Sequence, residues 1–213
     1  MDDVEVDESE QHSGARTGYR RSAGSKRGEA RRRELLDRVT DDLAVNGLVD
    51  FSLRRAARAA DTTHKVLLYH FDGVEDLLQQ GVVQLRGRRT GRALVAATEG
   101  SAERPLADRV RAIWPILVGA EARVLDQAIG LAMYDPEHYS DLAKEASKQY
   151  LPTLLSICPE NWTAQRKLEI AELILGVLRG FLVEWRTSGD GDGIGAGFEA
   201  LVRALEREEA AED

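Results

Sequence analysis

Basic side chains are concentrated in one stretch of the chain. Residues 12–71 hold 13 Lys or Arg against 7 Asp or Glu, whereas residues 1–11 hold six acids and no base. Residues 72–213 carry eight more acids than bases, so the net charge of -8 conceals a segment with a charge of +6. Because guanidinium and ammonium groups neutralise phosphates, such a segment indicates a part of the chain that binds a polyanion such as DNA.

The sequence lacks the residue combinations that are typical of catalysis or metal binding. Cys158 is the single cysteine, which excludes an intrachain disulfide, a CxxC redox pair and a cysteine zinc cluster. The four His residues are scattered, and no Ser-His-Asp or Cys-His arrangement can be recognised. We therefore expect no enzyme activity, no catalytic residue, no metal site and no cofactor.

The same sequence features predict where the protein works. A lone thiol fits a reducing compartment, and the acidic N-terminus lacks the apolar core of a secretory signal. The longest apolar run, residues 173–178, ends at Arg179 and is too short to cross a bilayer. We expect a cytoplasmic protein with no membrane partner.

The hydrophobic pattern that positions these residues is helical, and no segment shows convincing strand alternation. Leu36, Val39 and Leu43, for example, recur at the spacing of one helix face. We expect an all-α fold of about nine helices, the last of them after a polar, Gly-rich loop at residues 188–193. The helices expected before that loop cover residues 29–46, 53–60, 64–70, 105–119, 121–134, 135–157 and 163–187, with a long helix that the capping box at residues 72–75 opens and that runs to about residue 98.

Two of these helices are short and flank a three-residue break at residues 61–63. Ser52 can N-cap the first, and Thr63 can N-cap the second. This arrangement has the geometry of a helix-turn-helix, in which the second helix enters the major groove of DNA. A capping box of Asp72 and Glu75 then predicts the start of a long helix, which would connect the basic end to the rest.

The run LLYHFDGVEDLL at residues 67–78, preceded by SLRRAARAAD at residues 52–61, resembles the DNA-binding region of TetR-family transcriptional regulators. The match covers about residues 33–80 without gaps. The resemblance implies a homodimer that places the helix at residues 64–70 in successive major grooves of a pseudo-palindromic, double-stranded DNA operator. It further implies a repressor that a small-molecule effector releases, with a dimer interface made by the two C-terminal helices of each subunit.

This reading divides the chain into four parts. Residues 1–27 are expected to be a disordered tail, first acidic and then basic, and residues 209–213 an acidic tail. Residues 28–73 would form a three-helix DNA-binding domain with the helix-turn-helix. Residues 74–208 would form a helical domain for ligand binding and dimerisation.

The resemblance also assigns DNA contacts to individual positions. One lies in the first helix of the helix-turn-helix, three lie in the first turn of the recognition helix, and an aromatic–His pair at its end would grip backbone phosphate. The residues so assigned are Arg54, Thr63, His64, Lys65, Tyr69 and His70.

Three positions depart from the family pattern. Asp61 replaces a turn glycine, Leu68 replaces a frequent phosphate-binding tyrosine, and Val74 replaces a lysine that commonly contacts phosphate. These changes remove hydrogen-bond donors. They leave open an alternative, a protein of the same fold that binds a small molecule or another partner but has lost operator recognition.

Large aromatic and embedded polar side chains of the C-terminal helices are candidates to line a pocket for a small apolar effector, although an individual aromatic side chain more often belongs to the core or an interface. Polar residues such as Glu172 and Arg179 could orient a ligand or pair with one another. The cluster of Arg86, Arg88, Arg89 and Arg92 is interpreted as a solvated helix face. The candidate ligand-binding residues are Trp114, Gln127, Met133, Tyr134, Tyr150 and Glu172.

Overall fold

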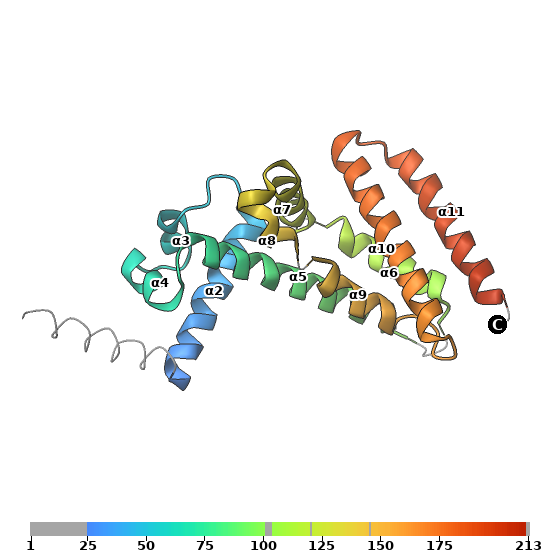
Figure 1. Cartoon of the computed structure of the whole chain (residues 1–213), viewed down its shortest axis with the longest axis horizontal. Helices are drawn as coiled ribbons and strands as arrows, with labels where there is room; N and C mark the ends of the chain where they lie inside the picture. The colour runs from blue at the N-terminus through green and yellow to red at the C-terminus, as the bar shows by residue number, and fades with distance from the viewer. Residues whose placement is uncertain (1–24, 101–103, 120, 145, 212–213) are drawn as a thin grey trace, which may run out of the picture. The chain divides into compact units, whose positions relative to one another are not determined.

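The computed structural model describes residues 25–100, 104–119, 121–144 and 146–211 (Figure 1). These residues form ten helices and no strand, which confirms the predicted all-α fold. None of the helices combines the length and the apolar character needed to cross a bilayer. Residues 1–24 and 212–213, which belong to the two expected tails, lie outside the described residues. The helices are α2 (Lys26–Asn46), α3 (Leu53–Ala59), α4 (His64–His70), α5 (Val74–Thr98), α6 (Leu106–Leu117), α7 (Ala122–Tyr134), α8 (Pro136–Lys144), α9 (Ala146–Ser156), α10 (Ala164–Thr187) and α11 (Gly191–Ala210).

The chain divides into two compact units. Unit 1 holds the described residues of Met1–Leu43 together with Val49–Gly81. Unit 2 holds Ala44–Leu48 together with the described residues of Val82–Asp213. Helix α5 belongs to both, because the division falls between its residues Gly81 and Val82.

Unit 1 is built on one face of α2. Leu35, Val39 and Leu43 are fully buried at the four-residue spacing that places side chains on one side of a helix. Each such burial contributes about 1.5–3 kcal/mol. Helix α5 approaches this face at Gly81, where a Cβ atom would lie only 2.6 Å from Leu43 Cδ1. The buried hydrophobic side chains of the other helices in unit 1 are Ala56, Ala57, Leu67 and Leu77.

The helix-turn-helix forms where the sequence predicted it. Ser52 Oγ accepts the Arg55 N–H at 3.3 Å, and Thr63 Oγ1 accepts the Val66 N–H at 3.3 Å, so both expected N-caps are present. Between the helices Asp61 adopts a left-handed backbone with a φ of 48°. The Thr62 N–H returns to Ala57 O at 2.9 Å and closes a Schellman motif around this aspartate.

The start of α5 differs in one detail from the prediction. The Asp72 N–H bonds to Asp76 Oδ2 at 2.9 Å, so the acid that reaches back is Asp76 and not Glu75. The reason is that Gly73, with a φ of 133°, provides the first carbonyl of the helix and bonds to the Leu77 N–H. The third residue of α5 is therefore Asp76, the position from which a capping side chain reaches back.

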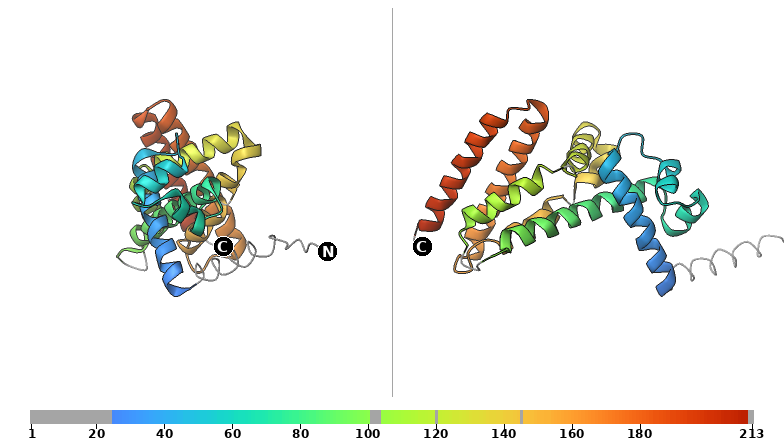
Figure 2. Two further views of the ribbon diagram at one scale, coloured as in Figure 1. Left: turned by 90° about the vertical axis from the view of Figure 1, so that its left-hand side faces the viewer. Right: turned by 180° about the vertical axis from the view of Figure 1, so that it is seen from behind.

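Unit 2 has its core among α5, α6, α9, α10 and α11, and Figure 2 shows α10 and α11 running side by side as a hairpin. Trp162, Ile174 and Phe198 are among its buried residues, from the loop before α10, from α10 itself and from α11. The pair α7 and α8 packs together in the same unit. The interior of unit 2 is therefore large enough to bury apolar residues from several helices.

The end of the chain is more ordered than the sequence pattern predicted. Helix α11 begins at Gly191, inside the expected loop, because Asp190 caps it by accepting the Gly193 N–H at 2.9 Å. The helix continues through the start of the expected acidic tail. Glu209 accepts the Leu106 N–H at 3.0 Å, so an acid of that tail caps the start of α6.

Candidate nucleic-acid interface and ligand cavity

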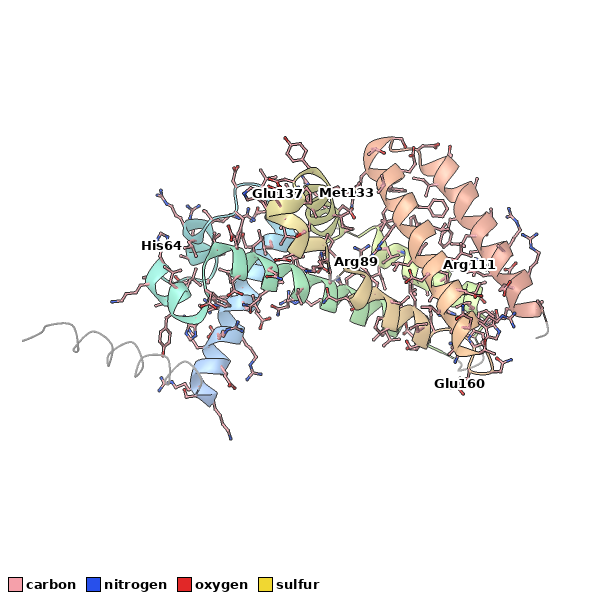
Figure 3. The ribbon with its side chains drawn as sticks, in the orientation of Figure 1. His64, Arg89, Arg111, Met133, Glu137 and Glu160 are labelled. Carbon is pink, nitrogen blue, oxygen red and sulfur yellow. The ribbon has the colours of Figure 1, made fainter. Side chains whose placement is uncertain are left out.

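The exposed side of α3 and α4 carries a basic surface, which we define as Arg54, Arg58, Thr63, His64 and Lys65. All five residues are exposed and border one shallow depression, and Figure 3 labels His64. The structure thus brings together four of the six residues that the sequence assigned to DNA contact. Arg58 was missed, although its position four residues after Arg54 places it on the same helix face.

The cations of the basic surface are available to an external partner. Arg54, Arg58 and Lys65 form no ion pair with any residue that the structure describes. Each phosphate contact made by such a side chain releases condensed counterions from DNA. Three neighbouring positive charges on one surface are therefore suited to a polyanionic backbone.

Tyr69 and His70 form a separate, half-buried pair at the end of α4. Their rings meet edge to face, with centroids 4.8 Å apart and an interplanar angle of 75°. His70 Nδ1 is buried and has no hydrogen-bond partner among the described residues. Burial, and next the positive charges of Arg32 and Arg31, lower the pKa of His70 below its ordinary value of 6.5. The imidazole is therefore neutral at pH 7.

One arginine near this pair is structural. Arg32 Nε donates to His70 O at 3.1 Å, and Arg32 Nη2 donates to Gln80 Oε1 at 2.5 Å. Its guanidinium also lies over the ring of Phe71, 4.8 Å from the centroid. The side chain thus joins α2 to the end of α4 and to α5 within unit 1.

Two further bases of unit 1 are used in the same way. Arg55 Nε pairs with Asp42 Oδ2 at 2.7 Å, with both side chains mostly buried. Arg38 Nη1 donates to Ala60 O at 3.2 Å. Part of the positive charge of this segment therefore holds its helices together, and only part can act on a partner.

Unit 2 contains a partly open cavity of about 340 Å³, lined by residues of α5, α6, α7, α9 and α10. Its wall is mostly aliphatic, with Leu117, Ile129, Leu154 and Leu178 among the lining side chains. The volume lies within the range of about 300–1,000 Å³ that is typical of small-molecule sites. Three arginines interrupt the apolar wall: Arg89, Arg179 and Arg186.

The prediction that the arginine cluster of α5 is a solvated face was wrong for two of its members. Arg86 and Arg89 are buried, with 1% and 3% of their surface exposed. Their guanidinium groups donate to main-chain carbonyls, Arg86 to Leu142 O and Arg89 to Leu117 O. These acceptors satisfy part of the donor set of each side chain, which makes burial of the charge possible.

No family model matches the chain, and no curated protein matches it significantly. Solved structures do. A transcriptional regulator from Pseudomonas aeruginosa PAO1 superposes with a TM-score of 0.60 at 17% identity, covering 86% of this chain and 92% of that one. A TetR-family member from Streptomyces coelicolor gives a TM-score of 0.57 at 17% identity, covering 81% and 96%.

The chain has the fold of TetR-family regulators. The multidrug binding protein EbrR, solved in complex with proflavin, shares this fold, with a TM-score of 0.58 at 18% identity over 81% of this chain and 98% of that one. The fold expected from the resemblance of residues 33–80 is thereby confirmed. At these identities the likeness is one of fold.

Within this TetR fold, the candidate ligand residues are separated. Met133 and Tyr150 line the cavity, and Figure 3 shows Met133 on α7. Trp114 stacks on Phe198 with centroids 5.2 Å apart and packs, partly buried, against the core. Tyr134 is 88% exposed, and Glu172 is exposed on α10.

Gln127, the remaining candidate, has a different partner. Its Oε1 accepts the Leu48 N–H at 3.0 Å. The neighbouring Gly47 has a φ of 75°, and a Cβ there would lie 2.7 Å from the same oxygen. The amide thus holds the segment that follows α2, where glycine provides both the backbone conformation and the space.

The cavity residues that sequence reasoning missed include three arginines, Arg89, Arg179 and Arg186. Arg89 follows the buried face of α5, four residues before the buried Ala93. That spacing in the sequence indicated a buried position, but the polarity of arginine favoured the interpretation of an exposed one. Arg179 was considered as a residue that could orient a ligand or pair internally, but it was not among the assigned sites.

Proposed function

We propose that the protein is a homodimeric, ligand-responsive DNA-binding transcriptional regulator that represses its target until a small molecule binds. The observation that carries the proposal is the pairing of two features in one chain. A helix-turn-helix presents the basic surface of α3 and α4, and a second unit contains a partly open cavity of about 340 Å³. The proposal includes a cytoplasmic location and no catalytic activity.

The recognition element is α4 of the helix-turn-helix. Thr63, His64 and Lys65 are exposed at its start, where a recognition helix contacts base edges. Arg54 and Arg58 of α3 lie on the same basic surface and can contact the flanking phosphates. Tyr69 and His70 would hold backbone phosphate at the other end of α4.

Dimerisation is supported by an exposed strip on α10, which we define as Leu168, Leu173, Gly176, Gly180 and Val183. All five residues are exposed, and a Cβ added at Gly176 or Gly180 would meet nothing within 4 Å. Apolar side chains beside open glycines form a flat surface on which a second helix can pack closely. With α11 beside α10, two subunits would form a four-helix interface.

The test of DNA binding is a footprint on the intergenic DNA beside the gene, followed by fluorescence anisotropy titrations at several salt concentrations. Arg54→Ala is expected to weaken binding about tenfold, and Lys65→Ala to reduce the salt dependence by about one counterion. Arg123→Ala, an exposed arginine of α7, is the matched control and should bind as the unchanged protein does. Absence of any footprint would contradict the proposal.

One observation favours the alternative of a TetR-fold protein without operator recognition. Leu68 is 53% exposed on α4, where the family pattern has a phosphate-binding tyrosine. An exposed leucine offers no hydrogen-bond donor to phosphate. This alternative predicts thermal stabilisation by a cavity ligand together with no DNA affinity above that of nonspecific binding.

A further inference from the structure

The cavity of unit 2 does not have the lining expected for a purely apolar ligand. Its wall is aliphatic over most of its area, but Arg89, Arg179 and Arg186 also line it. Among the described residues of the lining, Asp126 is the only acid. The lining therefore carries more positive than negative charge.

Arg89 is the most buried of these cations (Figure 3). Nη2 donates to Leu117 O at 2.8 Å, which leaves other donors of the guanidinium for a further partner. Nε is buried and makes no hydrogen bond within the described part of the chain, where Arg89 also forms no ion pair. A buried cation with an unused donor is costly unless an anion or acceptor meets it.

Arg179 reaches the same part of the cavity from α10. The guanidinium carbons of Arg89 and Arg179 lie 5.7 Å and 5.8 Å from the centroid of one ring, that of Tyr150. Burial lowers the pKa of the Arg179 guanidinium, while Tyr150 and Glu172 act in the opposite direction. Two cations from different helices thus converge on one aromatic side chain.

The acids near the cavity are engaged by another arginine or lie outside its lining. Asp126 is engaged by Arg186, with Oδ2 and Nε 3.0 Å apart. Glu172 acts on Arg179 but is exposed on α10 and does not line the cavity. A ligand that enters the cavity therefore meets two cationic groups beside an aliphatic wall.

We infer that the ligand is an amphipathic organic anion, with an apolar body against the aliphatic wall and a carboxylate or similar group between Arg89 and Arg179. Guanidinium groups recognise carboxylates through paired, charge-assisted hydrogen bonds. The phenol of Tyr150 lies beside both cations and can add a donor to the same group. The inference rests on the proposed function only in taking this cavity as the effector site, and it replaces the purely apolar effector expected from the sequence.

The test uses the full-length protein without DNA and three probes that share a ten-carbon chain. Decanoate, decanol and decylamine differ only in the charge of the head group, and their dissociation constants are measured by isothermal titration calorimetry. Decanoate is expected to bind roughly 10- to 100-fold more tightly than decanol, the range for hydrogen bonds to a charged group. Decylamine is expected to bind more weakly than either.

Variants locate the preference in the cavity. Arg89→Met and Arg179→Met each replace the guanidinium group with an uncharged side chain of roughly similar length. Each should reduce the preference for decanoate over decanol by tenfold or more. Circular dichroism identifies a variant that fails to fold, in which case the other variant decides. Arg123→Ala, an exposed arginine outside the lining, should retain the full preference.

Several outcomes would overturn the inference. They are equal binding of decanoate and decanol, preference for decylamine, no binding of decanoate at millimolar concentration, or an unchanged preference in the folded arginine variants. Release of DNA by uncharged ligands would leave the proposed function intact while removing the inference. Tight, arginine-dependent binding of decanoate by a protein that binds no DNA would support the inference and contradict the proposed function.

Discussion

The exposed arginines of unit 1 and the buried arginines of unit 2 are suited to different partners. In unit 1 the arginines that cross-link helices meet counter-charges or acceptors, as Arg55 does at Asp42, and Arg54 and Arg58 remain exposed in water. In unit 2 Arg86 and Arg89 are buried and are bonded to main-chain carbonyls without an ion pair to any described residue. An exposed cation is solvated at little free-energy cost, whereas a buried cation without an anion destabilises the folded state. We interpret the first as suited to an extended polyanion and the second as suited to one small anion in the cavity.

The comparison also shows that the net charge of a segment overstates the charge that faces a partner. Arg32, Arg38 and Arg55 lie in the basic segment, but their guanidinium groups are bonded within unit 1. The charge available to DNA resides in the basic surface of α3 and α4. Four substitutions test the roles assigned to charged groups in the two units, from the largest expected effect to the smallest.

Replacement of Arg32 tests whether a base of unit 1 is structural. Arg32→Ala removes two hydrogen bonds and the contact with the Phe71 ring, and we expect it to lower the free energy of unfolding by about 2–3 kcal/mol. Arg33→Ala, the exposed neighbour, should change it by less than about 0.5 kcal/mol. Urea denaturation followed by circular dichroism measures both. Equal effects would remove the distinction between cross-linking and exposed arginines.

Replacement of Arg89 tests the other side of the comparison. In the ligand-free protein Arg89→Met removes a buried charge and one bond to Leu117 O, two effects of opposite sign. We expect the free energy of unfolding to change by no more than about 1 kcal/mol in either direction. The same denaturation experiment applies. A loss of several kcal/mol would mean that Arg89 is a structural cross-link like Arg32.

Asp61 tests the electrostatics of the basic surface. It is an exposed acid in the turn between Arg58 and Thr63, and its φ of 48° is unfavourable for a side chain. Asp61→Gly should stabilise the protein by about 0.5–1 kcal/mol and tighten DNA binding a few-fold by removing a negative charge. Asp50→Gly, also at a positive φ of 57°, should stabilise without changing DNA affinity. Anisotropy titrations of both variants distinguish the two effects.

His70 gives the smallest effect, a dependence of stability on pH. Because the pKa of His70 is lowered in the folded state, the unfolded chain takes up a proton first as the pH falls through 6.5. The folded state therefore loses stability from about pH 7 downward until the folded imidazole also titrates. His70→Gln should show a smaller fall in melting temperature between about pH 7 and pH 5. An identical fall in both proteins would contradict this assignment.

The sequence predicted the helix-turn-helix well because its signals are local. Ser52 and Thr63 cap the helices that follow them, and α4 begins and ends at the predicted residues 64 and 70. Cap residues act within three positions of themselves, so a single sequence contains the information. The predicted start of α11 was wrong for a related reason. The glycines of residues 188–193 indicated a loop, and this outweighed the N-cap that Asp190 provides.

The cavity was harder to predict because its determinants are distant along the chain. Arg89 can be buried since Leu117 O, 28 residues away, accepts its hydrogen bond, and Gln127 is occupied by Leu48, 79 residues away. No local pattern records such partners. Tyr150 and Met133 were found through their size and their place among apolar helices, which is a weaker signal than a cap.

The single thiol of the chain has a practical consequence. Cys158 is buried and donates to Leu154 O at 3.3 Å, and burial raises the pKa of its thiol against the opposing charges of Lys167 and Arg109. Thiolate-directed reagents will therefore leave it unmodified. A cysteine introduced at the exposed Leu68 would then be the one reactive site, and spin labels there would report the separation of the two α4 helices in a dimer. Double electron–electron resonance with and without decanoate would measure any change in that separation without removing the native cysteine.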